Sequence, residues 1–158
     1  MVSDTHMPRG ERHIPERCLE VIRKSDALIH AGDFVAEEVL LELEALGPPV
    51  HAVHGNVDSY ELRARLPAEL SIELGGVRIA VVHDAGPRQN RLVRLRQRFP
   101  GADAVVFGHS HLPLHESEEG FQIFNPGSPT ERRRARSHTM GLARVEHGEL
   151  QFQLIELS

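Results

Sequence analysis

Four short apolar segments of this chain end in polar side chains of the kind that bind metal ions. Ala27–His30 leads to Gly32-Asp33, Val50–Val53 to Gly55-Asn56, Val77–Val82 to His83-Asp84, and Ala104–Phe107 to Gly108-His109-Ser110-His111. Apolar segments of this length are typical of buried β-strands. Because ligands of open α/β sheets bind at the carboxyl ends of the strands, the pattern predicts a sheet that gathers these side chains at one edge.

Helical patterns lie between the predicted strands. Apolar residues recur at helical spacing from Ile14 to Ile22, and two shorter stripes begin at Val39 and Leu92. The two shorter stripes stop at Gly47 and Pro100, which are residues that commonly end helices. This alternation of strands and helices predicts βαβ units and a mostly parallel sheet in the first two thirds of the chain.

The last third of the chain has a different pattern. Leu114–Ser117 and Phe121–Phe124 flank a Glu-Glu-Gly turn, and Thr139–Glu146 and Glu149–Leu157 flank His147-Gly148. Apolar and glutamine residues alternate from Leu150 to Leu154, which is the period of a half-buried strand. We therefore expect an antiparallel part after the βα part, within a single domain that covers residues 1–158.

Composition argues against several classes of function. The formal net charge of −5 provides no overall positive field, so neither nucleic acid nor an anionic membrane is an expected partner. Apolar runs stop at about six residues, whereas a membrane-spanning helix needs about 20. The N-terminal residues lack the apolar core of a signal peptide, and the single cysteine, Cys18, fits a reducing compartment. We expect a soluble, cytoplasmic protein.

Histidine is unusually frequent, with 11 residues against one tyrosine and no tryptophan. Asp4 and His6 are two residues apart, as are His109 and His111; in an extended chain such residues point to the same face. Either pair can therefore address one ion, and the second pair can also divide between two ions. Carboxylate, imidazole and amide ligands without a thiolate suit a catalytic site for Mn, Fe, Zn, Co or Ni. His30 lies within a predicted strand and is expected in the core.

The order of these motifs resembles the calcineurin-like metallophosphoesterase superfamily. The motifs are Asp4-Thr5-His6, Gly32-Asp33, Gly55-Asn56, His83 and Gly108-His109-Ser110-His111. The stretch Asn125-Pro126-Gly127-Ser128-Pro129 is similar to the small bacterial and archaeal phosphodiesterase branch, to which the retromer scaffold subunit is also similar. The resemblance covers essentially the whole chain. It implies an α/β fold, a four-layer α/β/β/α sandwich of two mixed sheets flanked by helices.

The resemblance also implies a site with two metal ions. One ion would be held by Asp4, His6, Asp33 and His111, and the other by Asp33, Asn56, His83 and His109, with Asp33 as the bridge. The expected cofactors are two divalent cations, manganese first, with zinc, iron, cobalt or nickel as alternatives. Two such ions about 3.5–4 Å apart can clamp a phosphoryl group, and a hydroxide between them can attack phosphorus in line.

The expected function is therefore that of a metal-dependent phosphodiesterase, a hydrolase that acts on a small-molecule phosphodiester. Asp33, Asn56 and His109 are the expected catalytic residues. A homodimer or a homotetramer is compatible with the sequence, which does not decide the oligomeric state. Two alternatives remain open: a scaffold of the same fold that keeps its metal ligands, and a dinuclear hydrolase of another ester or an amide. The complete ligand set favours the enzyme.

Several residues permit more than one interpretation. Val57 stands where much of the superfamily has a histidine thought to protonate the leaving group, so the proton donor is unassigned and His54 is a minor candidate. Asp58 and Asp84 either support metal ligands or are turn carboxylates in solvent. The charged run Glu131–Arg136 is either a solvated loop or a group whose arginines reach the site and grip substrate phosphate.

The first three residues raise a separate question. Met1–Ser3 is shorter than a usual strand of about five or six residues, and the ligands Asp4 and His6 follow directly. We expect Met1–Ser3 to pair in the sheet and the metal site of Asp4 and His6 to bind more weakly than its neighbour. We also expect the true start to lie a few codons upstream, because a ligand pair needs a rigid base.

Overall fold

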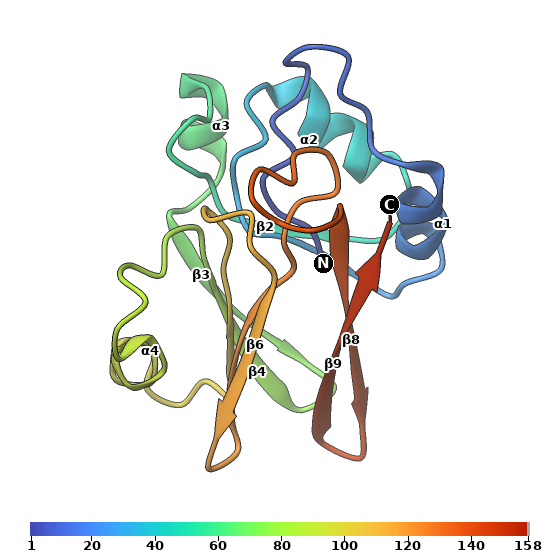
Figure 1. Cartoon of the computed structure of the whole chain (residues 1–158). Helices are drawn as coiled ribbons and strands as arrows, with labels where there is room; N and C mark the ends of the chain where they lie inside the picture. The colour runs from blue at the N-terminus through green and yellow to red at the C-terminus, as the bar shows by residue number, and fades with distance from the viewer. Residues whose placement is uncertain (158) are drawn as a thin grey trace.

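The computed structural model describes residues 1–157 and has a mixed α/β fold (Figure 1). The helices are α1 (Glu16–Arg23), α2 (Glu37–Glu44), α3 (Tyr60–Arg65) and α4 (Arg91–Arg98). The strands are β1 (Leu28–His30), β2 (Val50–Ala52), β3 (Glu69–Leu74), β4 (Val77–Val82), β5 (Ala104–Val106), β6 (Leu114–Glu118), β7 (Phe121–Asn125), β8 (Thr139–Glu146) and β9 (Glu149–Glu156). Within the described residues, none of the helices is long and apolar enough to cross a membrane.

One sheet has five strands in the order β3-β4-β5-β7-β6. The three central strands β4, β5 and β7 are parallel, and an antiparallel strand pairs at each edge. The parallel strands are almost wholly buried, as expected for strands that are covered on both faces. The parallel pairs β1-β2 and β4-β5 lie in the first two thirds of the chain and the antiparallel hairpins β6-β7 and β8-β9 in the last third, as predicted, whereas the antiparallel hairpin β3-β4 was not predicted.

The segment Met1–Ser3 joins the remaining strands. The Val2 N–H donates to the Ile29 carbonyl, and the Ala31 N–H donates to the Val2 carbonyl, which pairs the segment with β1. On its other side, Met1 exchanges two backbone hydrogen bonds with Gly141 of β8, at 2.8 and 2.9 Å. The parallel pair β1-β2 and the antiparallel pair β8-β9 thus flank the first residues, and the predicted pairing of Met1–Ser3 is confirmed.

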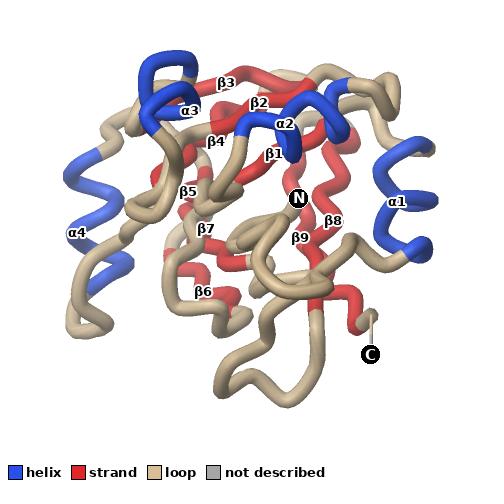
Figure 2. Tube along the Cα trace, turned by 90° about the horizontal axis from the view of Figure 1, so that it is seen from above, coloured by secondary structure: helices blue, strands red, loops and turns tan. Residues whose placement is uncertain are grey.

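Three apolar clusters define the layers. α1 and α2 pack through Ile22 and Leu40 on one face of the strands that flank Met1–Ser3. The cluster that contains Ile29, Ile79 and Phe124 fills the space between the two groups of strands. The remaining cluster packs Leu95 of α4 against the outer face of the five-stranded sheet. Figure 2 shows α1 and α4 on opposite sides of the strands, which gives the order helix, sheet, sheet, helix expected from the resemblance.

Two elements are absent from the sequence-based predictions. α3 has only six residues, too few to show a helical period, although Ser59 caps it by accepting a hydrogen bond from the Leu62 N–H at 3.3 Å. β3 alternates exposed and half-buried residues and pairs with β4 through a tight turn at Gly75-Gly76. Its alternating leucine and isoleucine residues, together with the two glycines, are the sequence signal that could have predicted this hairpin.

Candidate metal centre

Seven polar side chains converge where the strands end. Asp33 follows β1, Asn56 follows β2, His83 directly follows β4, and His109 and His111 follow β5; Asp4 and His6 follow the Met1–Ser3 segment. These are the seven residues predicted as metal ligands. Asp4, His6 and His111 form one group with ligand atoms within 4.8 Å of one another, and Asp33, His83 and His109 form a second. The pair His109 and His111 thus divides between the two groups.

Asn56 joins the second group. Its Oδ1 lies 3.0 Å from His83 Nε2 and 3.1 Å from His109 Nδ1. Asp33 lies between the groups, because its Oδ2 is 3.5 Å from His6 Nε2 and 3.2 Å from His83 Nε2. A carboxylate in this position can contribute to both groups at once.

The spacing of these atoms suits metal coordination. Metal–nitrogen and metal–oxygen bonds of about 2.1 Å place neighbouring ligands of one ion roughly 3.0–3.4 Å apart. Close pairs of ligand atoms are separated by distances from 3.0 Å, for Asn56 and His83, to 3.8 Å, for Asp4 and His6. In addition, Nε2 of His6 and of His111 is buried without a hydrogen-bond partner. A cation would satisfy both nitrogens, so the residues present fit a metal site.

Hydrogen bonds on the far side of two imidazole rings aim their lone pairs at the centre. His111 Nδ1–H donates to the Glu131 carbonyl at 2.6 Å, and His83 Nδ1–H donates to the Ala31 carbonyl at 2.7 Å. A carbonyl only accepts, so the proton resides on Nδ1 and, in the neutral ring, Nε2 keeps its lone pair. Metal-ligating histidines in proteins are normally oriented in this way.

The charges of the site shift the ionisation of its groups. Burial raises the pKa of Asp33, but the hydrogen bond and charge of His83 and the N–H of Val57 outweigh it and lower this pKa to about 2. Burial lowers the pKa of His83, yet the carboxylates of Asp33 and Asp4 raise it above its usual value. The pKa of His111 is lowered, chiefly by burial. Asp33 is therefore ionised at neutral pH and available as an anionic ligand.

The ligand residues are not in the extended conformation assumed above. φ is positive at five of the seven ligands: Asp4 (55°), His6 (46°), Asp33 (61°), His109 (69°) and His111 (59°). Asp4 and His6 lie in one group, and His109 and His111 divide between the two groups, but the extended-chain reason given for these arrangements is wrong. Left-handed turns at the strand ends bring the side chains inward, and hydrogen bonds from other loops hold these turns.

Glycine is required at two of the strand ends because other atoms approach the backbone closely. A Cβ at Gly55 would overlap the Asp33 carboxylate, and a Cβ at Gly108 would overlap the Ser3 hydroxyl. Both neighbours are fixed in place, since Asp33 is a candidate ligand and Ser3 Oγ donates to Asp4 Oδ2 at 2.6 Å. The glycines therefore allow the ligand loops to approach one another.

Asp58 and Asp84 have different roles. The buried carboxylate of Asp58 accepts backbone hydrogen bonds from Asp33 at 3.1 Å, Val35 at 2.7 Å and Gly55 at 2.6 Å. It thereby ties the loop that carries Asp33 to the loop that carries Asn56. Asp84 is exposed and accepts from the Gly86 N–H, so it is a turn carboxylate. The supporting role left open for both residues holds for Asp58 alone.

The loop after β7 also fastens the ligand segments, and most of its contacts were not predicted. Ser128 Oγ–H donates to the Asp4 carbonyl at 2.7 Å, and Thr130 Oγ1–H donates to the Thr5 carbonyl at 2.6 Å. Asn125, the last residue of β7, donates from Nδ2–H to the Gly108 carbonyl at 2.9 Å. Glu131 Oε2 lies 3.8 Å from His6 Nδ1 and 3.9 Å from His111 Nδ1. The Asn-Pro-Gly-Ser motif marks this loop, but Glu131 lies in a charged run, and nothing in the local sequence distinguishes it from its neighbours.

The remaining candidates lie outside the two groups. His30 is fully buried; its Nδ1 accepts from the Gly32 N–H and its Nε2 bonds Thr5 Oγ1, both at 3.1 Å, which confirms the core assignment. Val57 contributes its backbone N–H to Asp33 Oδ1 at 3.0 Å, and its apolar side chain cannot supply a proton. His54 is half-buried, and its closest polar contact is the neighbouring Gly55 carbonyl at 3.5 Å.

Comparison with known proteins agrees with this geometry. Residues 1–148 match the family model described as "Calcineurin-like phosphoesterase superfamily domain". A probable metallophosphoesterase of Methanothermobacter thermautotrophicus is 32% identical over 157 residues, which cover 98% of this chain and 90% of the relative. A phosphodiesterase of Methanocaldococcus jannaschii is 25% identical, over 80% of this chain and 81% of its own length.

A solved structure shows the same fold at lower sequence similarity. The protein Vps29 of Entamoeba histolytica, crystallised in complex with zinc, superposes with a TM-score of 0.77 at 18% identity, covering 99% of this chain and 97% of its own. The family match spans nearly the whole chain and includes all seven converging side chains. The chain therefore belongs to the calcineurin-like phosphoesterase superfamily.

Proposed function

We propose that this protein is a metal-dependent phosphodiesterase with a dinuclear centre. Asp4, His6, Asp33 and His111 would hold one divalent cation, and Asp33, Asn56, His83 and His109 the other. The observation that carries the proposal is the position of Asp33 Oδ2, which lies within 3.5 Å of a histidine nitrogen from each group. The phosphodiesterase of Methanocaldococcus jannaschii supports the choice of substrate class.

The side chains of the site would have different roles in the reaction. Two divalent cations, when bound, neutralise phosphate charge and lower the pKa of a water molecule so that it can attack phosphorus. Asp33 supplies an anionic carboxylate between the two positions, and Asn56 supplies a neutral oxygen, which limits the negative charge facing an anionic substrate. His83 is held by Ala31 and keeps its ring fixed during the reaction.

His109 has a separate role at the mouth of the site. Unlike the other histidine ligands it is exposed, and its Nδ1 lies 3.1 Å from Asn56 Oδ1. Because Nδ1 faces the group that would hold the second cation, we assign to the other ring nitrogen, Nε2, the contact with a phosphate oxygen of the substrate. Because Val57 offers no proton, departure of the leaving group depends on the stability of the leaving oxygen itself.

The direct test is hydrolysis of bis(p-nitrophenyl) phosphate after chelation and reloading with manganese, with zinc as the second metal because of the Vps29 complex. We expect hydrolysis that requires metal. Elemental analysis should show that Asp33→Asn disturbs two bound ions, whereas His83→Ala loses mainly one. A protein that takes up no manganese at micromolar levels would contradict the two-metal proposal. Metal uptake without hydrolysis of any phosphoester would favour the scaffold alternative.

A further inference from the structure

Two loops beside the metal centre concentrate positive charge on an acidic chain. Arg9 and Arg12 lie in the loop before α1, and the loop between β7 and β8 carries Arg132, Arg133, Arg134 and Arg136. We call these six residues the arginine rim. The chain as a whole has a net charge of −5, whereas residues 9–13 and 131–136 contain six arginines and two glutamates.

Most of the arginine rim has no internal anion to neutralise it. Within residues 1–157, the guanidinium groups of Arg9, Arg133, Arg134 and Arg136 have no hydrogen-bond or ion-pair partner, and all four side chains are exposed. Arg12 pairs with Glu131 at 2.9 Å, and Arg132 donates to the Ala135 carbonyl at 3.2 Å. A cluster of like charges repels itself and attracts anions from solution.

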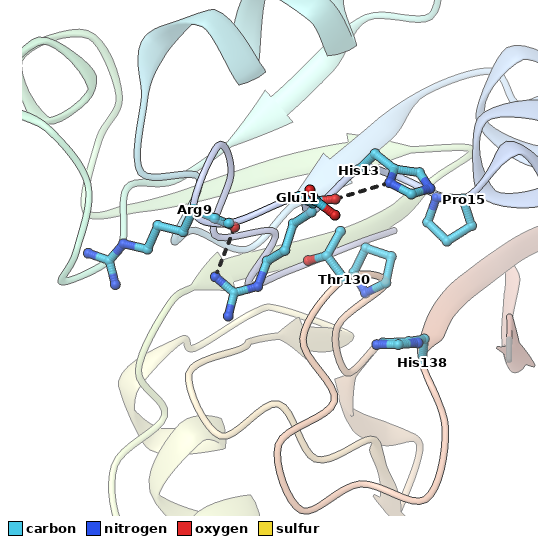
Figure 3. A pocket seen from close by; sticks show the side chains of 9 residues that line it. Arg9, Glu11, His13, Pro15, Thr130 and His138 are labelled. Carbon is cyan, nitrogen blue, oxygen red and sulfur yellow. Dashed lines mark hydrogen bonds between the residues drawn. The ribbon is translucent and has the colours of Figure 1, made fainter.

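An open cavity of about 560 Å³ lies between the two loops (Figure 3). Arg9, Arg12 and His13 line it from the first loop, and Thr130 and His138 line it from the second. Glu11 is the one acidic side chain in this lining. Cavities of this size are typical of small-molecule sites.

The arginine rim is continuous with the metal centre. The Glu131 carbonyl accepts a hydrogen bond from His111 Nδ1 at 2.6 Å, and Thr130, which lines the cavity, holds the Thr5 carbonyl between two candidate ligands. Arg133 is two residues beyond Glu131 in the same loop. A phosphoester bound at the metal centre would therefore have the rim beside it.

We infer that the arginine rim binds phosphate groups of the substrate other than the one being cleaved. The preferred substrate is then a phosphodiester that carries at least one further phosphate. Guanidinium groups suit this role because they bind phosphate oxygens through two parallel hydrogen bonds. The identification of the ligand as substrate rests on the proposed function, but phosphate binding by the rim requires no metal and can be measured separately.

The first experiment measures binding of tripolyphosphate by calorimetry to protein stripped of metal with a chelator. We expect binding that weakens as salt is added. Arg9→Gln and Arg133→Gln should each lower the affinity, by about two- to fivefold per exposed charge contact. Arg144→Gln is the matched control, since Arg144 is an exposed arginine on β8 without a partner in the described residues, and it should leave the affinity unchanged.

Two outcomes of this experiment would overturn the phosphate site. One is the absence of binding to the metal-free wild-type protein, and the other is equal affinity in the wild type and both rim variants. Arg9→Lys and Arg133→Lys keep the charge but lose the paired N–H donors, so each should lose less affinity than the corresponding Gln variant. Affinity lost equally in the Lys and Gln variants, with unchanged melting temperature, would also contradict a charge-based site.

The second experiment assigns the ligand to the substrate. It compares bis(p-nitrophenyl) phosphate, which has no further phosphate, with a p-nitrophenyl diester of a nucleoside 5′-phosphate that carries a 3′-phosphate. Arg133→Gln should raise KM for the second substrate by about two- to fivefold and leave kcat unchanged. Tripolyphosphate binding without this KM effect would overturn the assignment to substrate. Tripolyphosphate binding without hydrolysis of either compound would instead overturn the proposed function and leave the phosphate site standing.

Discussion

At the scale of single residues, the candidate ligands adopt a backbone conformation that costs free energy. Each of the five ligands with positive φ is an aspartate or histidine, for which the left-handed region costs about 1 kcal/mol. Hydrogen bonds from Ser128 and Thr130 to the backbone around Asp4 offset part of this cost. Part of the geometry of the candidate ligands is therefore held by the protein's own hydrogen bonds.

Asp58 should be the most sensitive supporting residue. Asp58→Asn replaces one carboxylate oxygen by an NH2 group and leaves at least one of the three bound N–H groups without an acceptor. We expect the free energy of unfolding to fall by about 1–3 kcal/mol, together with weaker manganese binding. Urea denaturation and metal titration measure the two effects. Asp84→Asn is the control; equal losses in both variants would contradict the tie between the two loops.

The apolar side chain at position 57 leads to a kinetic prediction. Without a positioned acid, aryl diesters should be cleaved faster than alkyl diesters, with a rate that depends steeply on the pKa of the leaving group. Val57→His should flatten this dependence, because a positioned acid typically contributes about 10²–10⁴-fold. The measurement is a series of substituted phenyl diesters. A flat series in the unmodified enzyme would show that another residue already supplies the proton.

The convergence of the seven candidate ligands could be predicted from the sequence, but their backbone conformations could not. Asp33, Asn56 and His83 each follow an apolar run, so local pattern alone places them at strand ends. The left-handed turn at His6 depends on contacts with a loop more than a hundred residues away, which no local pattern reports. The position of Glu131 beside His6 and His111 also depends on distant contacts, whereas its neighbours in sequence are solvent-exposed arginines.

At the scale of elements, the loop between β7 and β8 is the main support of the ligand segments. Ser128 Oγ donates to the Asp4 carbonyl and accepts from the Glu131 N–H at 2.8 Å. Ser128→Ala removes the shorter of the two side-chain hydrogen bonds to the Asp4 carbonyl and leaves the part-buried Glu131 N–H without its acceptor, so we expect a loss of about 1–3 kcal/mol in unfolding free energy. The manganese affinity of the group that contains Asp4 should fall more than that of the other group. Ser117→Ala on exposed β6 should change neither quantity.

Long apolar elements were predicted more accurately than short or half-exposed ones. β4 and β8 have the predicted bounds, because each is a continuous apolar or alternating run next to a turn. α3 and β3 were missed, since α3 spans less than two helical turns and β3 lies at the edge of its sheet. The order of the strands in the sheets depends on packing between distant segments and was not predicted; the family resemblance implied only the four layers.

At the scale of the whole molecule, buried His30 makes the stability of the metal-free protein depend on pH. Burial, and then the charge of His83, lower the pKa of His30 well below 6.5, so it stays neutral in the folded protein while the unfolded chain takes up a proton below pH 6.5. The unfolding free energy should therefore fall on acidification, by about 1.4 kcal/mol per pH unit below 6.5. Asp33, with a pKa of about 2, loses its stabilising effect only between about pH 4 and 2.

The comparison of wild type with His30→Gln isolates this effect, because glutamine does not titrate and the raised pKa of His83 acts on both proteins. Urea denaturation at pH 7, 6 and 5 gives the free energy of unfolding of each protein. As the pH falls, this free energy should decrease more in the wild type than in His30→Gln. The additional decrease should reach about 2 kcal/mol between pH 6.5 and 5. Parallel pH profiles would show that His30 carries a proton in the folded state.

The three backbone hydrogen bonds that the buried Asp58 carboxylate accepts have a consequence for the motions of the molecule. Loops at the edge of a sheet normally open more often than the strands that precede them, and their amide hydrogens exchange quickly with solvent. Here the amides of Asp33, Val35 and Gly55 can exchange only when Asp58 leaves its site. The hydrogen-exchange rates of these loop amides should therefore be as slow as those of the core strands. The part of the fold that opens most slowly then extends to the edge where the substrate would bind.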